Sequence, residues 1–302
     1  MEKEVTLVTA FFDIGRKDFK VIPRSNEQYF SYFKVWAKMK NKLIVYTNSL
    51  MAQKVKEERE KWGLLDKTIV IEINDETSIV PDIFKKMTEI SRNPYFLNYR
   101  LKSNAMSNNA HYDYVMLLKY WCLADAVKNG YADGMLAWID FGFNHGDSCY
   151  INPDEFNFCW KTKLEEKIHL FTLGDITQKP IFHLVRTLED SIMGCIIILP
   201  SSLCEKFWNL IKQSTEALID VGFIDDDQLM VLMAYRKEKD VFRIHESDWF
   251  LPLKENGPEH LTVQEKNEQN KNIVRKLREK INLSKRKEIN SYLKRIKKEI
   301  GN

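Results

Sequence analysis

Short apolar runs rich in β-branched residues alternate along this chain with longer segments of helical periodicity. This order of elements predicts an α/β fold in which a mostly parallel sheet is flanked by helices. Strands are expected at residues 5–12, 42–46, 68–73, 135–139, 168–172, 183–187 and 194–199. Helices are expected at residues 26–39, 52–62, 112–129, 202–219 and from Gln228 onward, and an irregular loop at residues 97–111.

The charge distribution separates a body from a tail. Residues 262–302 hold 13 Lys+Arg and 5 Asp+Glu, whereas the rest of the chain carries a net charge of −5. No linker rich in Pro, Gly or Ser divides the first 261 residues. We therefore expect one domain over residues 1–261 and a basic amphipathic helical tail over residues 262–302.

Composition and missing motifs exclude several classes of protein. Five widely spaced cysteines without a C-x-x-C pair argue against a disulfide framework or a zinc cluster. The chain contains no G-x-G-x-x-G, no G-x-x-x-x-G-K-[ST] and no G-x-S-x-G, so the usual signatures of dinucleotide oxidoreductases, P-loop ATPases and α/β-hydrolases are missing. The opening MEKEV lacks the features of a signal peptide, and no apolar stretch approaches the roughly 20 residues of a membrane span. The expected location is cytoplasmic.

The segment LAWIDFGFNHGD, residues 136–147, is the most informative for function, because a carboxylate, Asp140, follows five apolar residues. Ligands of parallel sheets bind at the carboxyl ends of the strands, so residues 9–13 and 140–145 are the first candidates for a site. Asp140 either caps the turn after its strand or provides a hard oxygen ligand for Mn²⁺ or Mg²⁺ bridging a nucleotide diphosphate. Both interpretations stay open on these residues alone.

Two segments carry a family resemblance: LLKYWCLADAVKNGYADGMLAWIDFGFNHG, residues 117–146, and VTAFFDIGR, residues 8–16. They resemble the HtrL/YibB family, bacterial proteins found with surface-polysaccharide genes such as those for capsule or lipopolysaccharide, and the resemblance covers about residues 4–250. That family in turn resembles GT-A glycosyltransferases, whose D-x-D motif at a strand end holds a metal ion and the donor diphosphate. This chain departs from that motif, since Gly142 stands where the second carboxylate is expected. Either Asp147 or a later side chain would supply a second ligand, or the site would use one carboxylate and waters.

The resemblance implies a GT-A-like (Rossmann-like) fold and transfer of a sugar from a nucleoside-diphosphate donor, expected to be UDP-linked, to a saccharide acceptor. The donor would contact main-chain groups of the first strand end, and side chains there and beside the Asp140 strand. The implied donor-binding residues are Thr9, Ala10, Phe11, Asp13, Arg16, Lys119, Trp138, Asp140 and Gly142. For Lys119, a solvated or structural lysine is the alternative interpretation.

Three adjacent carboxylates, Asp225, Asp226 and Asp227, stand at the start of an amphipathic helix. As structure, acidic residues in a first turn complement the helix dipole. The resemblance adds a second interpretation, in which one of the three is the general base that deprotonates the acceptor hydroxyl in an inverting transfer. Adjacent acids raise one another's pKa values, which suits a base that works near neutral pH. We place Asp226 first in this role.

His245 follows 18 residues after Asp227, and the resemblance implies a late histidine as a second metal ligand beside Asp140. A lone histidine also has many structural uses, so that alternative stays open.

The tail presents 12 Lys/Arg between Lys271 and Lys298, with Ile and Leu at helical spacing. Residues 271–300 therefore form either solvated helices or a basic amphipathic surface for an anionic membrane, as a lipid-linked glycan acceptor would require. Nucleic acid ranks last as a partner, because the body is acidic and no stacking aromatics accompany the tail. Two alternatives to the enzyme remain: a catalytically silent scaffold that binds nucleotide or glycan, and a nucleic-acid binder.

Overall fold

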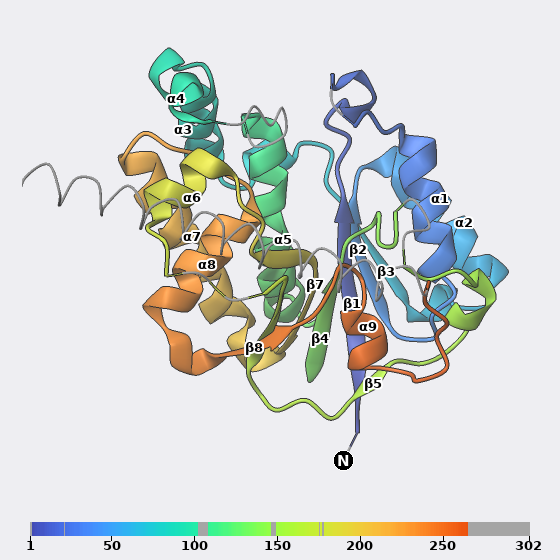
Figure 1. Cartoon of the computed structure of the whole chain (residues 1–302). Coiled ribbons are helices and arrows are strands. Elements are labelled where there is room, and N and C mark those ends of the chain that lie inside the picture. The colour runs from blue at the N-terminus through green and yellow to red at the C-terminus, as the bar shows by residue number, and fades with distance from the viewer. Residues whose placement is uncertain are drawn as a thin grey trace, which may run out of the picture. The chain divides into compact units, whose positions relative to one another are not determined.

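A computed structural model of the chain describes residues 2–20, 22–101, 108–145, 149–174, 176 and 178–264 (Figure 1). The chain divides into two compact units, Met1–Leu261 and Thr262–Asn302. Residues 265–302 lie outside the described part, so the predicted helices at 271–300 stay a prediction.

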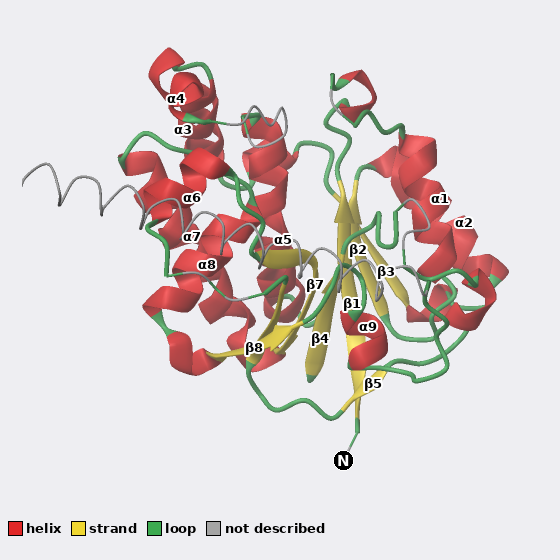
Figure 2. Ribbon diagram, viewed as in Figure 1, coloured by secondary structure: helices red, strands yellow, loops and turns green. Residues whose placement is uncertain are grey.

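The first unit is built on an eight-stranded sheet with the order β3-β2-β1-β4-β7-β6-β8, in which β5 pairs with β1 (Figure 2). The strands are β1 (Lys3–Phe11), β2 (Leu43–Thr47), β3 (Thr68–Glu72), β4 (Met135–Ile139), β5 (Lys161–Thr162), β6 (Ile168–Thr172), β7 (Ile192–Pro200) and β8 (Phe242–Glu246). β1 to β4 are mutually parallel, and β8 is parallel to β6. β7 runs antiparallel to both β4 and β6. The predicted α/β fold with a mostly parallel sheet is confirmed.

Helices cover the sheet on both sides (Figure 1). They are α1 (Asn26–Trp36), α2 (Ser49–Lys61), α3 (Pro81–Ser91), α4 (Pro94–Tyr99), α5 (Ala110–Lys128), α6 (Ile181–Thr187), α7 (Ser201–Asp220), α8 (Asp227–Lys237) and α9 (Pro252–Glu255). In Figure 1, α1 and α2 lie beside β2 and β3, whereas α3 and α5 to α8 lie on the other side. None of the helices in the described ranges is long and apolar enough to cross a bilayer.

Two predictions about local structure are wrong. The strand expected at residues 183–187 is helix α6, which follows Pro180 and buries Leu184 and Val185 on one face; its β-branched composition misled the prediction. The irregular loop expected at residues 97–111 contains the end of α4 and the start of α5. Asn93 and Asn109 accept hydrogen bonds from the first turns of these two helices, as N-cap residues do. The sequence analysis also missed α3 and β8.

The alternation of side chains along β4 places the key carboxylate. Leu136 and Trp138 belong to the core that α5 closes on one face of the sheet. Because side chains alternate along a strand, Asp140, two residues beyond Trp138, projects toward the same face. The strand therefore presents Asp140 to α5 at the carboxyl end of the parallel strands.

Candidate functional site

A buried lysine joins two of the predicted site carboxylates. The ammonium of Lys119, on α5, lies 3.0 Å from Oδ1 of Asp140 and 2.8 Å from Oδ2 of Asp227, and 3.2 Å from the main-chain oxygen of Gly194 on β7. Lys119 donates hydrogen bonds to Asp227 and Gly194, and its contact with Asp140 is an ion pair. Burial acts to lower the pKa of Lys119, but Asp140 and Asp227 raise it overall, so the lysine stays charged.

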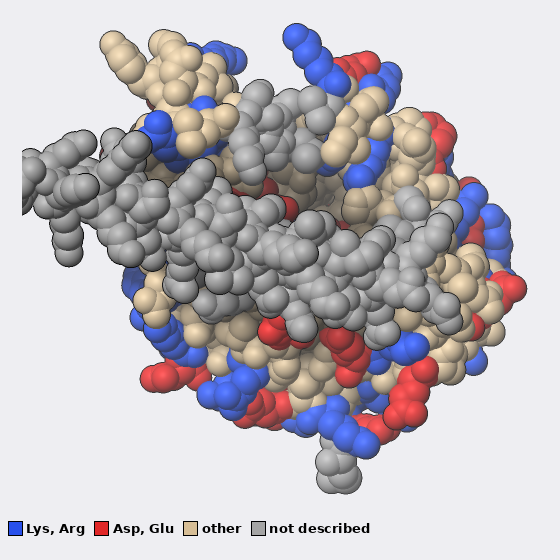
Figure 3. All heavy atoms as spheres, in the orientation of Figure 1, with Lys and Arg blue, Asp and Glu red and all other residues tan. Residues whose placement is uncertain are grey.

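One carboxylate oxygen of Asp140 has polar partners among the described residues, and the other has none. Its Oδ1 accepts a hydrogen bond from the indole Nε1 of Trp138 at 2.7 Å, in addition to the contact with Lys119. No contact of Oδ2 is found among the described residues, and the side chain is 34% exposed. Asp140 therefore has one carboxylate oxygen with no hydrogen bond or ion pair to the described residues. Figure 3 shows Lys and Arg side chains, in blue, interspersed with Asp and Glu side chains, in red, along the lower edge of this face.

Aromatic packing fixes the turn that follows Asp140. The ring of Phe141 stacks on that of Phe33, from α1, with centroids 4.5 Å apart. Trp36 donates from its indole nitrogen to the main-chain oxygen of Phe141 at 3.4 Å. These contacts set the direction in which β4 ends, and the sequence signal for them is the run of aromatics on both sides of Asp140.

The three acids at the start of α8, Asp225, Asp226 and Asp227, have different surroundings. Asp227 pairs with Lys119, and Asp225 pairs with Arg100 at 3.2 Å, both side chains being buried. Asp226 accepts a hydrogen bond from the main-chain nitrogen of Gln228 as the N-cap of α8, and no ion pair is found for it within the described residues. Burial, followed by the repulsion of Asp225 and Asp227, raises the pKa of Asp226 well above its ordinary value. Burial also raises the pKa of Asp225, to about 6.

A fourth carboxyl group, Asp113 on α5, was missed by the sequence analysis. It is fully buried, and neither of its oxygens has a hydrogen-bond partner among the described residues. Burial, together with the nearby Asp225 and Asp226, raises its pKa well above the ordinary value. An aspartate in the first turns of a helix usually complements the helix dipole, so nothing in the sequence distinguished this one.

We predict that Asp113→Asn changes the dependence of stability on pH. The raised pKa means that folded Asp113 retains a proton above the pH at which the unfolded chain loses it, so the free energy of unfolding of the parent falls as pH rises. Asparagine has no such proton. Relative to the parent, the free energy of unfolding of the variant should rise by about 1.4 kcal/mol per pH unit between the pKa of Asp113 in the unfolded chain and its pKa in the folded protein. Below both pKa values this difference should vanish. Urea unfolding at several pH values measures it; parallel curves for the two proteins would contradict it.

Two arginines extend the site on the side of β1. The guanidinium of Arg16 lies 5.1 Å from the ring centroid of Tyr112 on α5, and Tyr112 is within electrostatic reach of Asp226, Lys119 and Asp227. Burial, followed by the positive charges of Arg24 and Arg16, lowers the pKa of His145 to about 4. The guanidinium groups of Arg16 and Arg24 also lie 6.0 and 5.9 Å from the ring centroid of Tyr29, which packs against Gly142 in the turn after Asp140. Arg24 was not predicted.

The other residues predicted at the end of β1 are engaged within the fold. Thr9 is fully buried, and the main-chain oxygen of Phe11 accepts a hydrogen bond from the Thr47 hydroxyl at 2.7 Å. Ala10 is partly buried in the ladder with β2. The carboxylate of Asp13 accepts hydrogen bonds from the nitrogen of Gly15 and the amide of Asn26.

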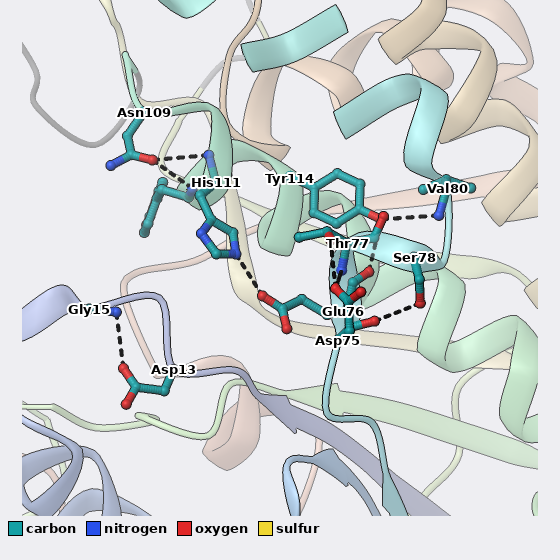
Figure 4. A network of polar contacts seen from close by, with 11 residues as sticks. Asp13, Gly15, Asp75, Glu76, Thr77, Ser78, Val80, Asn109, His111 and Tyr114 are labelled. Atoms are coloured by element: carbon teal, nitrogen blue, oxygen red, sulfur yellow. Dashed lines mark hydrogen bonds and ion pairs between the residues drawn. The ribbon is translucent and has the colours of Figure 1, made fainter. Parts of the chain in front are cut away.

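Figure 4 shows Asp13 directed at Gly15, and separately a pair formed by His111, on α5, and Glu76. The imidazole Nε2 of His111 lies 2.6 Å from the Glu76 carboxylate. This pair ties the start of α5 to the segment that follows β3.

The described residues provide no preassembled set of ligands for the expected metal ion. No group of three His, Cys, Asp or Glu side chains suited to a metal is present in the part of the chain that the structure describes. His245 lies on β8, where its Nε2 contacts Nδ1 of His169 at 2.9 Å. β7 and β6 separate β8 from β4, which amounts to about 14 Å at ordinary strand spacing. The structure thus does not bring His245 and Asp140 together; Asp147 lies outside the described residues.

Known proteins are similar to most of this chain. A family model described as "Bacterial protein of unknown function (HtrL_YibB)" matches residues 3–254. The chain is 28% identical to Protein HtrL of Escherichia coli (strain K12) over 269 residues, 83% of this chain and 91% of that relative. Among solved structures, apo mouse xyloside xylosyltransferase 1 superposes with a TM-score of 0.42 at 11% identity, covering 80% of this chain and 85% of that one. The PaToxG glycosyltransferase gives 0.36 at 10% identity, with 79% and 72% covered.

Proposed function

Since this chain belongs to the HtrL/YibB family of bacterial proteins, whose function is not established, we propose a function from its own site: a glycosyltransferase that uses a nucleoside-diphosphate sugar. One observation carries the proposal. Lys119 bridges Asp140, at the end of β4, and Asp227, at the start of α8. The bridge supports a single site in which Asp140 and the neighbour of Asp227, Asp226, whose pKa is raised by burial, act on the same substrate.

In this proposal the donor lies across the end of β4. The open Oδ2 of Asp140 accepts a hydrogen bond from a hydroxyl of the donor sugar or ribose, as a carboxylate does. Arg16 and Arg24 are near enough to the following turn to affect His145, and guanidinium groups suit the paired oxygens of a diphosphate. They would stabilise the negative charge that develops on the leaving group. A UDP-linked sugar is the expected donor.

Asp226 is the proposed base. The acceptor hydroxyl gives its proton to the Asp226 carboxylate while its oxygen bonds to the anomeric carbon of the donor sugar. The bond from that carbon to the diphosphate oxygen breaks, and the nucleoside diphosphate leaves with the electron pair. A single displacement of this kind inverts the anomeric configuration. The raised pKa of Asp226 suits a base that works near neutral pH.

The acceptor is proposed as a saccharide, and a lipid-linked surface glycan is the finer form of the proposal. Residues 271–300 would then bring the enzyme to an anionic membrane. They lie outside the described residues, so this part rests on the basic amphipathic pattern of the sequence alone.

A nucleotide screen tests the proposal. Thermal unfolding of the protein is measured with UDP, GDP, CMP and dTDP, and at least one is expected to stabilise it, by about 2.7 kcal/mol at 100 times its Kd. Asp140→Asn should remove the shift, because the amide keeps an oxygen for Lys119 and Trp138 but turns an N–H₂ donor toward the ligand. Asp133→Asn, an exposed acid before β4, should behave like the parent. Absence of any nucleotide shift, or an Asp140→Asn protein shifted like the parent, would contradict the proposal.

A further inference from the structure

Resting on the function proposed above, we infer that Lys119 is a built-in cation that takes the place of a divalent metal ion, so that the nucleoside diphosphate binds without metal. The observation behind this inference is that the Lys119 ammonium lies between the carboxylates of Asp140 and Asp227 and the main-chain carbonyl of Gly194.

The oxygens around Lys119 are those that a hard divalent cation takes in proteins, namely carboxylates and a main-chain carbonyl. Here they lie 2.8 to 3.2 Å from the lysine nitrogen, which is hydrogen-bonding geometry for an ammonium. Lys119 is only 4% exposed. The Lys119 ammonium, a side chain of α5, thus already occupies the position between Asp140 and Asp227 that a metal cation would take.

A second carboxylate for a metal is disfavoured at the position where the D-x-D pattern requires it, because the space for a Cβ atom there is tight. A Cβ atom on Gly142 would lie 3.0 Å from Cε1 of Tyr29 and 3.7 Å from Tyr32. The Tyr29 ring itself packs on Phe11, with centroids 5.2 Å apart. An aspartate at this position would therefore have to displace an aromatic ring that is held by the end of β1.

The lysine acts through the carboxylates and is a positioning residue. Lys119 donates hydrogen bonds to Asp227 and to the main-chain oxygen of Gly194, and its ammonium lies 3.0 Å from Oδ1 of Asp140. It holds Asp140 at the donor and Asp227 at the start of α8 in one arrangement. The positive charge proposed for the diphosphate comes from Arg16 and Arg24, whose guanidinium groups lie 6.0 and 5.9 Å from the ring centroid of Tyr29, beside Gly142.

Calorimetric titration of UDP and of GDP into the wild-type protein, in EDTA and in excess Mn²⁺, tests the inference directly. The expected result is a Kd equal within about twofold under the two conditions. Binding that disappears in EDTA and returns with Mn²⁺ would overturn the inference and leave the proposed function standing. Failure of both nucleotides to bind under either condition would instead remove the proposed function, and the inference with it.

Lys119→Met provides a readout that a merely structural role would not give. The variant keeps an unbranched side chain but leaves Asp140 and Asp227 without a shared cation, so it should bind Mn²⁺, measured by electron paramagnetic resonance, whereas the wild type should not. Lys128→Met, at an exposed position of the same helix, is the control and should bind none. Circular dichroism checks that the variant is folded. A folded Lys119→Met protein that takes up no Mn²⁺ would overturn the inference. A wild-type protein that binds Mn²⁺, with the binding lost in Asp140→Asn, would also overturn it. Should Lys119→Met fail to fold, the titrations in EDTA and in Mn²⁺ decide.

Discussion

Asp226→Asn is expected to slow sugar transfer by about 10²- to 10⁴-fold, the contribution of a positioned general base, and to leave nucleotide binding unchanged. Asparagine cannot take the acceptor proton. It remains a good N-cap for α8, because asparagine and aspartate serve about equally there, so the helix start is preserved. The measurement is release of nucleoside diphosphate from the best-bound donor, with a panel of saccharide acceptors. In the parent protein, the rate should fall as pH decreases and the Asp226 base becomes protonated.

Asp220→Asn is the matched control for this experiment, since Asp220 is an exposed acid at the end of α7. It should turn over like the parent. An Asp226→Asn protein with undiminished turnover would exclude Asp226 as the base. Full nucleotide binding in a parent that shows no transfer with any donor would favour the silent scaffold.

Gly194→Ala is expected to lower the free energy of unfolding by about 3 to 5 kcal/mol, as when one partner of a buried ion pair is removed. A Cβ atom at this position would lie 2.0 Å from Oδ2 of Asp227, the oxygen that accepts from Lys119. The carboxylate must move and stay buried without its cation. Elsewhere in a strand, exchanging glycine for alanine stabilises by roughly 0.5 to 1 kcal/mol, so the sign of the effect is diagnostic. Urea unfolding measures it.

A double-mutant cycle isolates the cause. In an Asp227→Ala background the clashing carboxylate is gone, and Gly194→Ala should cost little, because the two effects share one contact. Equal costs in the two backgrounds would show that the added methyl group clashes with something other than Asp227.

The sheet could be predicted from the chain because its first strands are local patterns. The runs that became β1 to β4 are apolar and β-branched, and Asp140 breaks β4 abruptly with a polar residue. Local pattern also caused the error at α6, where His183, Val185 and Thr187 resemble a strand. Only the packing of Leu184 and Val185 against the core distinguishes the two.

Partnerships across the chain could not be predicted in the same way. Lys119 and Asp227 are 108 positions apart, and the role of Gly194 follows from its closeness to Asp227 once α8 is placed on β7. The orphaned Asp113 has the sequence signature of an ordinary helix start. The pairing of His245 with His169 depends on β8 lying next to β6, and β8 was not predicted. Long-range contacts of this kind belong to the fold, and no spacing in the sequence encodes them.

If a nucleotide binds at the open oxygen of Asp140, the indole N–H of Trp138 should report its binding directly. This group donates to Asp140 Oδ1 at 2.7 Å, and its resonance in an amide-nitrogen correlation spectrum is assigned with Trp138→Phe. We predict that the nucleotide that binds best shifts the Trp138 indole resonance and leaves that of Trp62, on the surface after α2, in place. A bound nucleotide that does not shift the Trp138 resonance would contradict the account.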